Sequence, residues 1–116
     1  MLIKRLEDVA KSAMAMEGAK DVVRQVPISG ADGSPAFSFR VFTIGPGGHT
    51  PFHTHDWEHL NYIISGEGAI VTENGSEREI RQGAFALVLP GEKHRYRNTS
   101  PDQPLVMICA VPKEYE

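Results

Sequence analysis

The sequence predicts an all-β fold in one domain, and three observations support that prediction. Short segments rich in aromatic and β-branched residues recur along the chain, as in FSFRVFTI and PLVMICAVP. Glycine, proline and asparagine separate these segments at short intervals, which is typical of a sandwich or barrel. Long helical segments do not alternate with them, so a parallel α/β sheet is not expected. The length of 116 residues is that of a single domain.

The expected elements follow in order along the chain. Residues 1–20 are expected to form an N-terminal arm, with an extended segment over residues 1–5 and then a loop or helical turn that ends by Gly18. Residues 21–116 are expected to form the barrel. Its strands are expected at residues 21–28, 37–44, 59–65, 69–73, 76–80, 85–89, 94–98 and 104–112.

The dipeptide Asn74-Gly75, between two of these strands, is the strongest turn signal in the chain. A type I′ turn needs positive φ at both central residues, and asparagine and glycine tolerate that conformation better than other residues. The sequence therefore predicts a tight hairpin with a type I′ turn at this position.

Composition excludes several classes of protein. The net charge is −3 and the pI is about 5.9, with no basic patch, so neither nucleic acid nor an anionic membrane is an expected partner. The only cysteine, Cys109, excludes an intrachain disulfide and is expected to be a small buried hydrophobe of the last strand. The N-terminus has charges where a signal peptide would be apolar, and the expected location is cytoplasmic.

Three of the five histidines lie in one short segment that has two interpretations. On a helix, His55, Glu58 and His59 would form the H-x-x-E-H site of a zinc metallopeptidase. On strands, His53 and His55 would share one face, and His59 would begin the next strand. The segment after His59 contains indifferent or poor helix formers and stops at Gly66, which favours strands.

The same region resembles the two sequence motifs of the cupins, which are small jelly-roll barrels built as a double-stranded β-helix. The first motif is G-x5-H-x-H-x3,4-E-x6-G, and the chain matches it from Gly47 to Gly66 with His59 in the place of the usual glutamate. The second motif is G-x5-P-x-G-x2-H-x3-N, which matches from Gly83 to Asn98 with the proline one place late. The resemblance implies a cupin barrel, and Asn98 is expected to have a structural role.

Finer features resemble one group within the cupins, the small single-domain manganese proteins with four histidine ligands. These features are the run H-x-H-x-W-E-H, the N-terminal arm and the I-C-x-x-P-K pattern near the C-terminus. The resemblance implies a homodimer with one divalent transition metal per chain, bound by His53, His55, His59 and His94. Manganese is the first expectation, and Fe, Ni, Cu or Zn are the alternatives, because imidazole alone does not select manganese.

Arg40 and Glu58 are the candidate catalytic residues besides the ligands. Arg40 lies in an apolar strand and is either solvated or a cation that holds a substrate carboxylate at the barrel mouth. Glu58 directly precedes His59, so on a strand it faces away as a surface carboxylate, and a base near the metal is the alternative. Three aromatic residues are expected first in the core: Phe42, Tyr62 and Phe85.

Three functions remain open from the sequence. The first is an oxygenase-like reaction on a small molecule, with the metal supplying charge and proximity. The second is a non-redox isomerase or lyase, and the third is a small-molecule-binding module without catalysis. Because the ligands must be neutral imidazoles, metal affinity is expected to fall below about pH 6.

Overall fold

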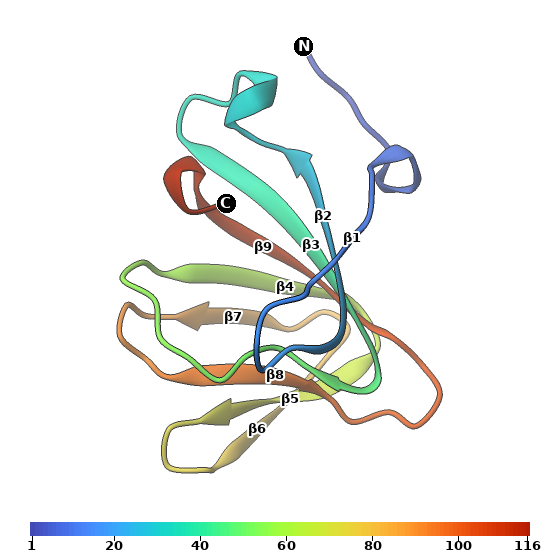
Figure 1. Ribbon diagram of the computed structural model, residues 1–116, viewed down its shortest axis with the longest axis vertical. Coiled ribbons are helices and arrows are strands. Elements are labelled where there is room, and N and C mark those ends of the chain that lie inside the picture. Colours follow the sequence, from blue (N-terminus) through green and yellow to red (C-terminus); the bar gives the residue numbers. More distant parts are fainter.

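The computed structural model describes residues 1–116, and strands are the main regular structure of the chain (Figure 1). The strands are β1 (Ser12–Ala13), β2 (Lys20–Ile28), β3 (Phe37–His49), β4 (His59–Ser65), β5 (Glu67–Thr72), β6 (Glu77–Arg81), β7 (Phe85–Val88), β8 (His94–Asn98) and β9 (Leu105–Pro112). The three short 3₁₀ helices are η1 (Leu6–Asp8), η2 (Gly30–Asp32) and η3 (Lys113–Tyr115). No helix has the length and apolar character that a membrane crossing requires.

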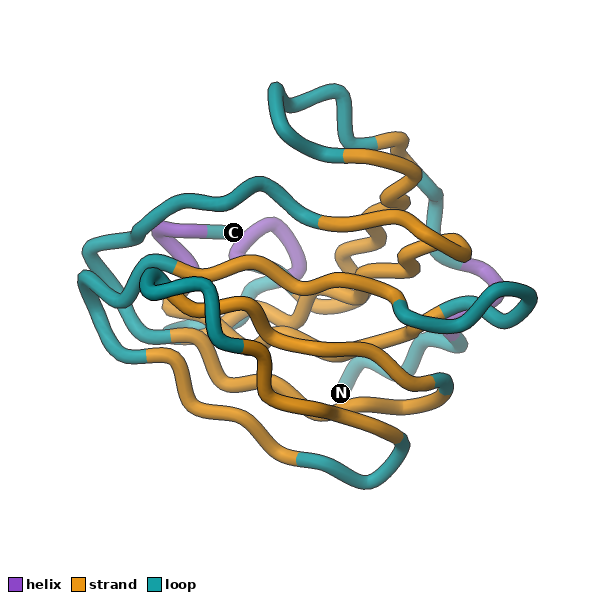
Figure 2. The backbone as a smooth tube through the Cα atoms, turned by 90° about the horizontal axis from the view of Figure 1, so that it is seen from below, coloured by secondary structure: helices purple, strands orange, loops and turns teal.

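One antiparallel sheet contains all the strands and curls around the core (Figure 2). Its main path runs β6-β5-β8-β3-β9-β4-β7, while β2 pairs with β3 and β1 pairs with β2. The two ends of the path, β6 and β7, both line one solvent-open groove, so the sheet curls far enough to bring its edges opposite each other. This architecture confirms the predicted all-β, jelly-roll type of barrel.

The longest strand, β3, connects the two parts of the sheet. It pairs with β9 from Phe37 to Ile44, and its last residue, His49, pairs with Arg97 of β8. Alternate residues of its first half point into the barrel, and these are buried: Ser38, Arg40, Phe42 and Ile44. This register turns the Arg40 side chain inward, which the sequence left open.

Apolar side chains from facing strands fill the core. The largest fully buried ones include Ile44, Ile63, Leu105, Met107 and Val111. Cys109 is 1% exposed among them, as expected from its position in the last strand. Asn98 confirms its expected structural role, because its amide donates to the carbonyl oxygens of Ile44 and Gln103, both at 2.8 Å.

The N-terminal arm packs along β2 (Figure 1). The buried Gln25 holds it by donating to the carbonyl oxygens of Leu6 at 2.9 Å and Val9 at 3.0 Å. Residues 1–5 pair with no strand and form the arm that the sequence offered as the alternative to a short strand, and the expected helical turn is present as η1. The arm continues to Met14 and Met16, which reach the cavity described below.

The β5–β6 hairpin is present at Asn74-Gly75, but the predicted type I′ turn is wrong. Gly75 has φ of 83°, whereas Asn74 is not among the residues with positive φ. The Gly75 amide donates to the carbonyl of Thr72, and the Thr72 amide donates to that of Ser76. This is a turn one residue longer, in which only glycine needs the left-handed conformation.

Candidate metal centre

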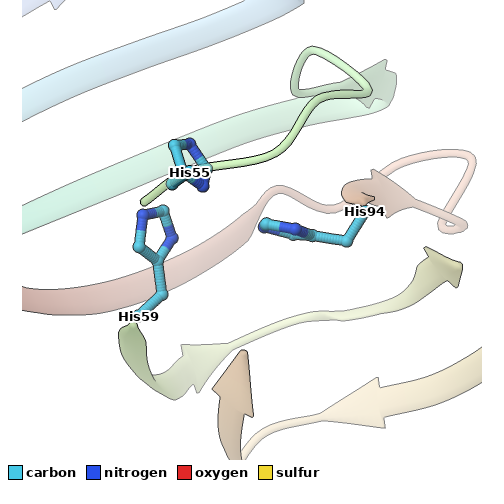
Figure 3. A group of neighbouring side chains, drawn as sticks. All are labelled: His55, His59 and His94. Atoms are coloured by element: carbon cyan, nitrogen blue, oxygen red, sulfur yellow. The ribbon is translucent and has the colours of Figure 1, made fainter. Parts of the chain in front are cut away.

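Three histidine rings converge at one end of the barrel (Figure 3). His59 comes from the first residue of β4, His94 from the first residue of β8, and His55 from the loop before β4. One ring nitrogen of each lies within 4.8 Å of those of the other two. The structure thus brings together three of the four histidines expected as ligands, from segments far apart in the sequence.

The loop of residues 50–58 is neither the helix nor the regular strand considered from the sequence. His53 forms one isolated antiparallel bridge with His94, in which each amide donates to the other's carbonyl at 3.2 Å. The Gly91 amide also donates to the carbonyl of His55 at 2.8 Å. Backbone hydrogen bonds to the segment around β8, and not strand alternation, therefore position His53 and His55. The absence of a helix removes the metallopeptidase interpretation.

His53 lies at the edge of this cluster. Its ring centroid is 4.3 Å from that of His55 and 6.4 Å from that of His94. Opposed residues of an antiparallel pair point to the same face, so the bridge directs His53 toward the side where His94 points. Its nitrogens are nevertheless not part of the set whose donors all lie within 4.8 Å. Its role as a fourth ligand stays a prediction.

The hydrogen bonds of the histidine rings use one nitrogen of a ring and keep the other free to bind a metal. Nδ1 of His94 is 2.8 Å from the carbonyl oxygen of Glu92, and Nδ1 of His53 is 3.0 Å from that of Pro51. Each Nδ1 therefore carries the proton and donates it, and each Nε2 keeps a lone pair. Nε2 of His59 is buried and has no hydrogen-bond partner. Such an atom is costly to bury without a partner, and a metal ion would satisfy it.

The protonation states also suit a metal. Burial, together with the charges of His53, His94 and Arg40, lowers the pKa of His55 to about 4. Burial and the same kind of neighbours lower the pKa of His59 to about 3, and burial also lowers the pKa of His94. These three imidazoles are therefore neutral at pH 7, which is the form that binds a divalent cation.

A cavity of about 400 Å³ opens beside the histidines. All four, including His53, line it, together with side chains that are mainly apolar: Met14, Met16, Phe42, Pro51, Trp57, Met107 and Tyr115. A larger groove of about 930 Å³ lies between β6 and β7, but it is open to solvent and includes only His94 of the histidines. The smaller cavity is the one that combines the four histidines with a mainly apolar wall, as small-molecule sites do.

Of the two candidate catalytic residues, Arg40 lies in the cavity and Glu58 does not. Arg40 is buried and lines the cavity. Glu58 is exposed and does not line it, so the structure does not bring this carboxylate to the histidines. Phe42 is buried as expected, whereas Phe85 is 83% exposed and stacks against Tyr62 on the outside of the barrel. The expectation of a core position is therefore wrong for Phe85 and also for Tyr62, which is half-buried on the outer face.

Tyr96 is a residue of the cavity that the sequence did not single out. It alternates with His94 along β8, so both side chains point inward. Its hydroxyl donates to Oδ1 of Asn61 at 2.5 Å, and burial raises the pKa of the phenol, which stays protonated at neutral pH. The signal that could have found it is its spacing of two from a predicted ligand.

The C-terminal residues and the ligand loop meet over the same cavity. The rings of Tyr115 and Trp57 stack in parallel, with centroids 4.0 Å apart and 3° between their planes. Both residues line the cavity, as does Glu116. This contact could not be predicted from the sequence, because Trp57 and Tyr115 lie far apart along the chain.

The fold and this cluster define a small β-barrel protein whose site suits a metal ion. The cupin domain family matches residues 40–111, which include all four histidines and Arg40. The chain therefore belongs to the cupin family. No curated protein matches the sequence.

Solved structures agree with this assignment. One is the polyketide cyclase RemF from Streptomyces resistomycificus, which is 28% identical with a TM-score of 0.90, over 97% of this chain and 79% of that one. A protein from Thermotoga maritima, described as a predicted oxalate decarboxylase, is 25% identical with a TM-score of 0.82, over 97% and 99%. Ectoine synthase from P. lautus, at 24% identity and a TM-score of 0.75 over 97% and 78%, shows the fold alone.

Proposed function

We propose that this cupin is a metal-dependent enzyme with oxygenase-like chemistry on a small molecule. One divalent transition metal would be bound by His55, His59 and His94, with His53 as the fourth ligand. The observation that carries the proposal is the convergence of three neutral imidazoles beside a mainly apolar cavity, with Nε2 of His59 buried and without a hydrogen-bond partner. A bound metal would supply Lewis acidity and, if redox-active, a means of using O₂. Manganese is proposed first, with Fe, Ni, Cu and Zn as alternatives.

The residues of the chain support catalysis by charge and proximity. Glu58 lies outside the cavity, the phenol of Tyr96 is held protonated, and Glu116 is the one carboxylate that lines the cavity. The apolar lining of the cavity excludes water, which strengthens the field of any charge inside. Binding and orientation of the substrate therefore fall to the metal ligands, the apolar lining and the few polar groups of the cavity.

A non-redox reaction is the second candidate, and one observation favours it. The structure with a TM-score of 0.90 and 28% identity is described as a polyketide cyclase. In this version the chain would be an isomerase or lyase, and O₂ would have no part.

Metal content is the first test of the proposal. Tag-free protein from cells grown in balanced trace metals is expected to contain about one transition metal per chain by elemental analysis. The His59→Ala variant is expected to lose it. The His49→Ala variant is the matched control, since His49 lies outside the cluster and is expected to retain the metal. Wild-type protein that binds none of the five metals after dialysis against each would contradict the proposal.

Oxygen dependence separates the versions of the function. Turnover of enols that needs O₂, with uptake above that of the free metal, would support the oxygenase-like reaction. Turnover that persists without O₂, or with redox-inert zinc, would support the isomerase or lyase. Tight binding of small molecules without turnover in either condition would leave the third possibility, a binding module.

We also propose a second copy of this chain as its protein partner. The outer sheet face, defined here as the outward side chains of β3, β9, β4 and β7, is apolar: Phe37, Phe39, Leu60, Tyr62, Phe85, Leu87 and Ala110. Pairing places Leu60 opposite both Leu87 and Ala110, so the face is continuous. It contains no charged residue, and such a face is complementary to itself, as a twofold dimer requires.

A further inference from the structure

Arg40 is a buried cation without an acidic partner. It is 9% exposed, and its Nε is buried with no hydrogen-bond partner. The three ion pairs of the structure are Lys4–Asp32, Arg5–Glu7 and Arg97–Glu77, so none includes Arg40. Its only side-chain hydrogen bond is from Nη2 to the sulfur of Cys109, at 2.9 Å, and the guanidinium lies 5.1 Å from the ring centroid of Phe42.

These contacts do not balance the charge. A cysteine sulfur is a weak acceptor, and a single aromatic ring compensates a cation only in part. A guanidinium does not lose its proton in a protein, so Arg40 cannot become neutral as a buried lysine would. A buried charge without a partner strongly destabilises the folded state. Its persistence in the core points to an anion that comes from outside the chain.

The position of Arg40 indicates where that anion binds. Arg40 lines the same 400 Å³ cavity as the four histidines, and its charge contributes to lowering the pKa of His55 and His59. Most of the other side chains that line the cavity are apolar and include Phe42 and Met107. The cavity therefore contains both the Arg40 cation and the histidine ligands, and the rest of its wall is mainly apolar.

We infer that Arg40 binds the carboxylate of a small organic acid, whose apolar body occupies the cavity and whose other end reaches the histidine cluster. The planar guanidinium suits a carboxylate because its parallel N–H groups can donate to both oxygens. The volume of the cavity is at the low end of the range for small-molecule sites, which fits an acid with a short aliphatic or single-ring body. This inference deepens the proposed function and relies on it for the metal at the far end.

Charged neighbours within the chain do not replace such a ligand. Glu116 lines the cavity, but its side chain is exposed and forms no ion pair with Arg40. The charge of Glu116 also acts on Arg24, where it raises the pKa. Burial and the charge of Arg40 outweigh this effect, and the pKa of Arg24 is lowered. Arg24 does not line the cavity, and no lysine or other arginine does, so an anion inside the cavity would meet Arg40.

The test measures binding of acids on metal-free protein. The probes are benzoate, phenylacetate and hexanoate, each compared with its neutral amide, by calorimetry and by the fluorescence of Trp57, the only tryptophan and a cavity residue. At least one acid is expected to bind more tightly than its amide. The Arg40→Met variant is expected to bind that acid at least about tenfold more weakly, with affinity for the amide unchanged.

Three variants serve as controls. Arg81→Met removes the same charge from an exposed position of β6 and is expected to leave acid binding unchanged. Arg40→Lys keeps the charge but loses the paired donors and is expected to bind with intermediate affinity. Glu116→Gln is expected to bind the acid at least as tightly as the wild type. Equal affinity of all acids and amides, or equal affinity of Arg40→Met and wild type for the acids, would overturn the inference.

Thermal unfolding gives a second readout that does not need high affinity. Without ligand, Arg40→Met is expected to have a higher Tm than the wild type, because it removes a buried charge with no partner. Added acid is expected to raise the Tm of the wild type and not that of the variant. An unliganded Arg40→Met protein that folds but melts below the wild type would show that the charge is balanced within the chain.

Repeating the titrations with metal separates the two proposals. Acid binding that depends on the metal and not on Arg40 would refute this inference and leave the proposed function in place. Acid binding that depends on Arg40 in a protein that takes up no metal would support this inference and refute the proposed function.

Discussion

His59 illustrates how burial prepares a metal ligand at the level of a single residue. It begins β4 and is 7% exposed, and its Nε2 is buried without a hydrogen-bond partner. Its pKa of about 3 means that no proton competes for this nitrogen at neutral pH. The chain thus bears the cost of a buried, unsatisfied imidazole, and a bound metal would remove that cost.

The lowered pKa values predict how the stability of the metal-free protein depends on pH. In the unfolded chain His55 and His59 have ordinary pKa values near 6.5, whereas in the folded chain these are about 4 and 3. Below pH 6.5 the unfolded chain therefore binds protons that the folded chain does not. Stability is expected to be complete above pH 6.5 and to fall as the pH is lowered toward 4. Urea unfolding at several pH values measures this.

The control for the pH dependence is His49→Ala, which is expected to keep the slope of the wild type. A midpoint of unfolding that is constant from about pH 7 to 5 would contradict the expected proton uptake. The same shifts also move proton competition for the metal to a lower pH than the value of about 6 expected from the sequence.

The number of ligands can be decided with His53. If it is the fourth ligand, the His53→Ala variant is expected to lower metal affinity by more than about 100-fold, which exceeds the usual cost of losing an outer-sphere partner. Competition with a chelator of known affinity measures the change. A loss of about tenfold or less would place His53 outside the ligand set, beside His55.

Some residues of this site can be predicted from the sequence, and others cannot. The spacing of the two motifs identified His55, His59 and His94, and two of these, His59 and His94, begin strands directly after loops. Arg40 and Tyr96 depend on strand register, and a shift of one residue exchanges the inner and outer faces. The outward position of Phe85 was missed for a similar reason: β7 is apolar on both faces, so its pattern does not indicate which face is buried.

Among the elements, the junction of β4 and β5 is the most constrained by its neighbours. Gly66 has φ of +87°, and a Cβ there would lie 2.2 Å from the carbonyl oxygen of Pro104 and 2.9 Å from Cα of Leu105. The last glycine of the first motif is thus required by backbone geometry. It allows β4 and β5 to turn sharply against the segment that enters β9.

A Gly66→Ala variant is expected to lose about 3 kcal/mol or more of unfolding free energy, because rigid backbone atoms must move in addition to the strain of positive φ. Gly33→Ala is the matched control, since Gly33 has φ of +92° but nothing within 4 Å of the added Cβ. It is expected to lose about 1 to 2 kcal/mol. Urea unfolding measures both, and equal losses would show that the contact with Pro104 has no effect.

The elements themselves were predicted better than their connections. Glycine and proline bounded the strands to within a few residues, because these residues end pairing for local reasons. β3 extended beyond its predicted end to His49, since pairing with β2 and β8 continued through a glycine-rich segment. The loop of residues 50–58 could not be predicted, because hydrogen bonds to a distant segment determine its path.

For the whole molecule, the outer sheet face predicts the oligomeric state. Light scattering after gel filtration is expected to give twice the mass of the chain. Phe85→Arg, which places a charge at the centre of an apolar contact, is expected to shift the protein to the monomer. Ile3→Arg is the control, because Ile3 is 84% exposed on the N-terminal arm and outside this face. A monomeric wild type at micromolar concentration would refute the dimer.

The barrel as a whole was predictable because two independent features of the sequence predict the same fold. The strand and turn pattern alone indicated an all-β barrel, and the motif spacing independently implied a cupin, which the family match establishes. The chemistry carried by the barrel follows less directly. Ligand residues define where a metal binds, while the substrate depends on the remaining wall of the cavity.

The bridge between His53 and His94 has a consequence for folding. A metal held by His55 and His94 would join the two ends of a chain segment of about 40 residues, much as a crosslink does. The hydrogen bonds of this bridge already hold these ends together without the ion. The amides of His53 and Gly91 should therefore exchange slowly with deuterated solvent even in apoprotein, and metal should slow them further. The site would then be assembled by the chain before it is filled.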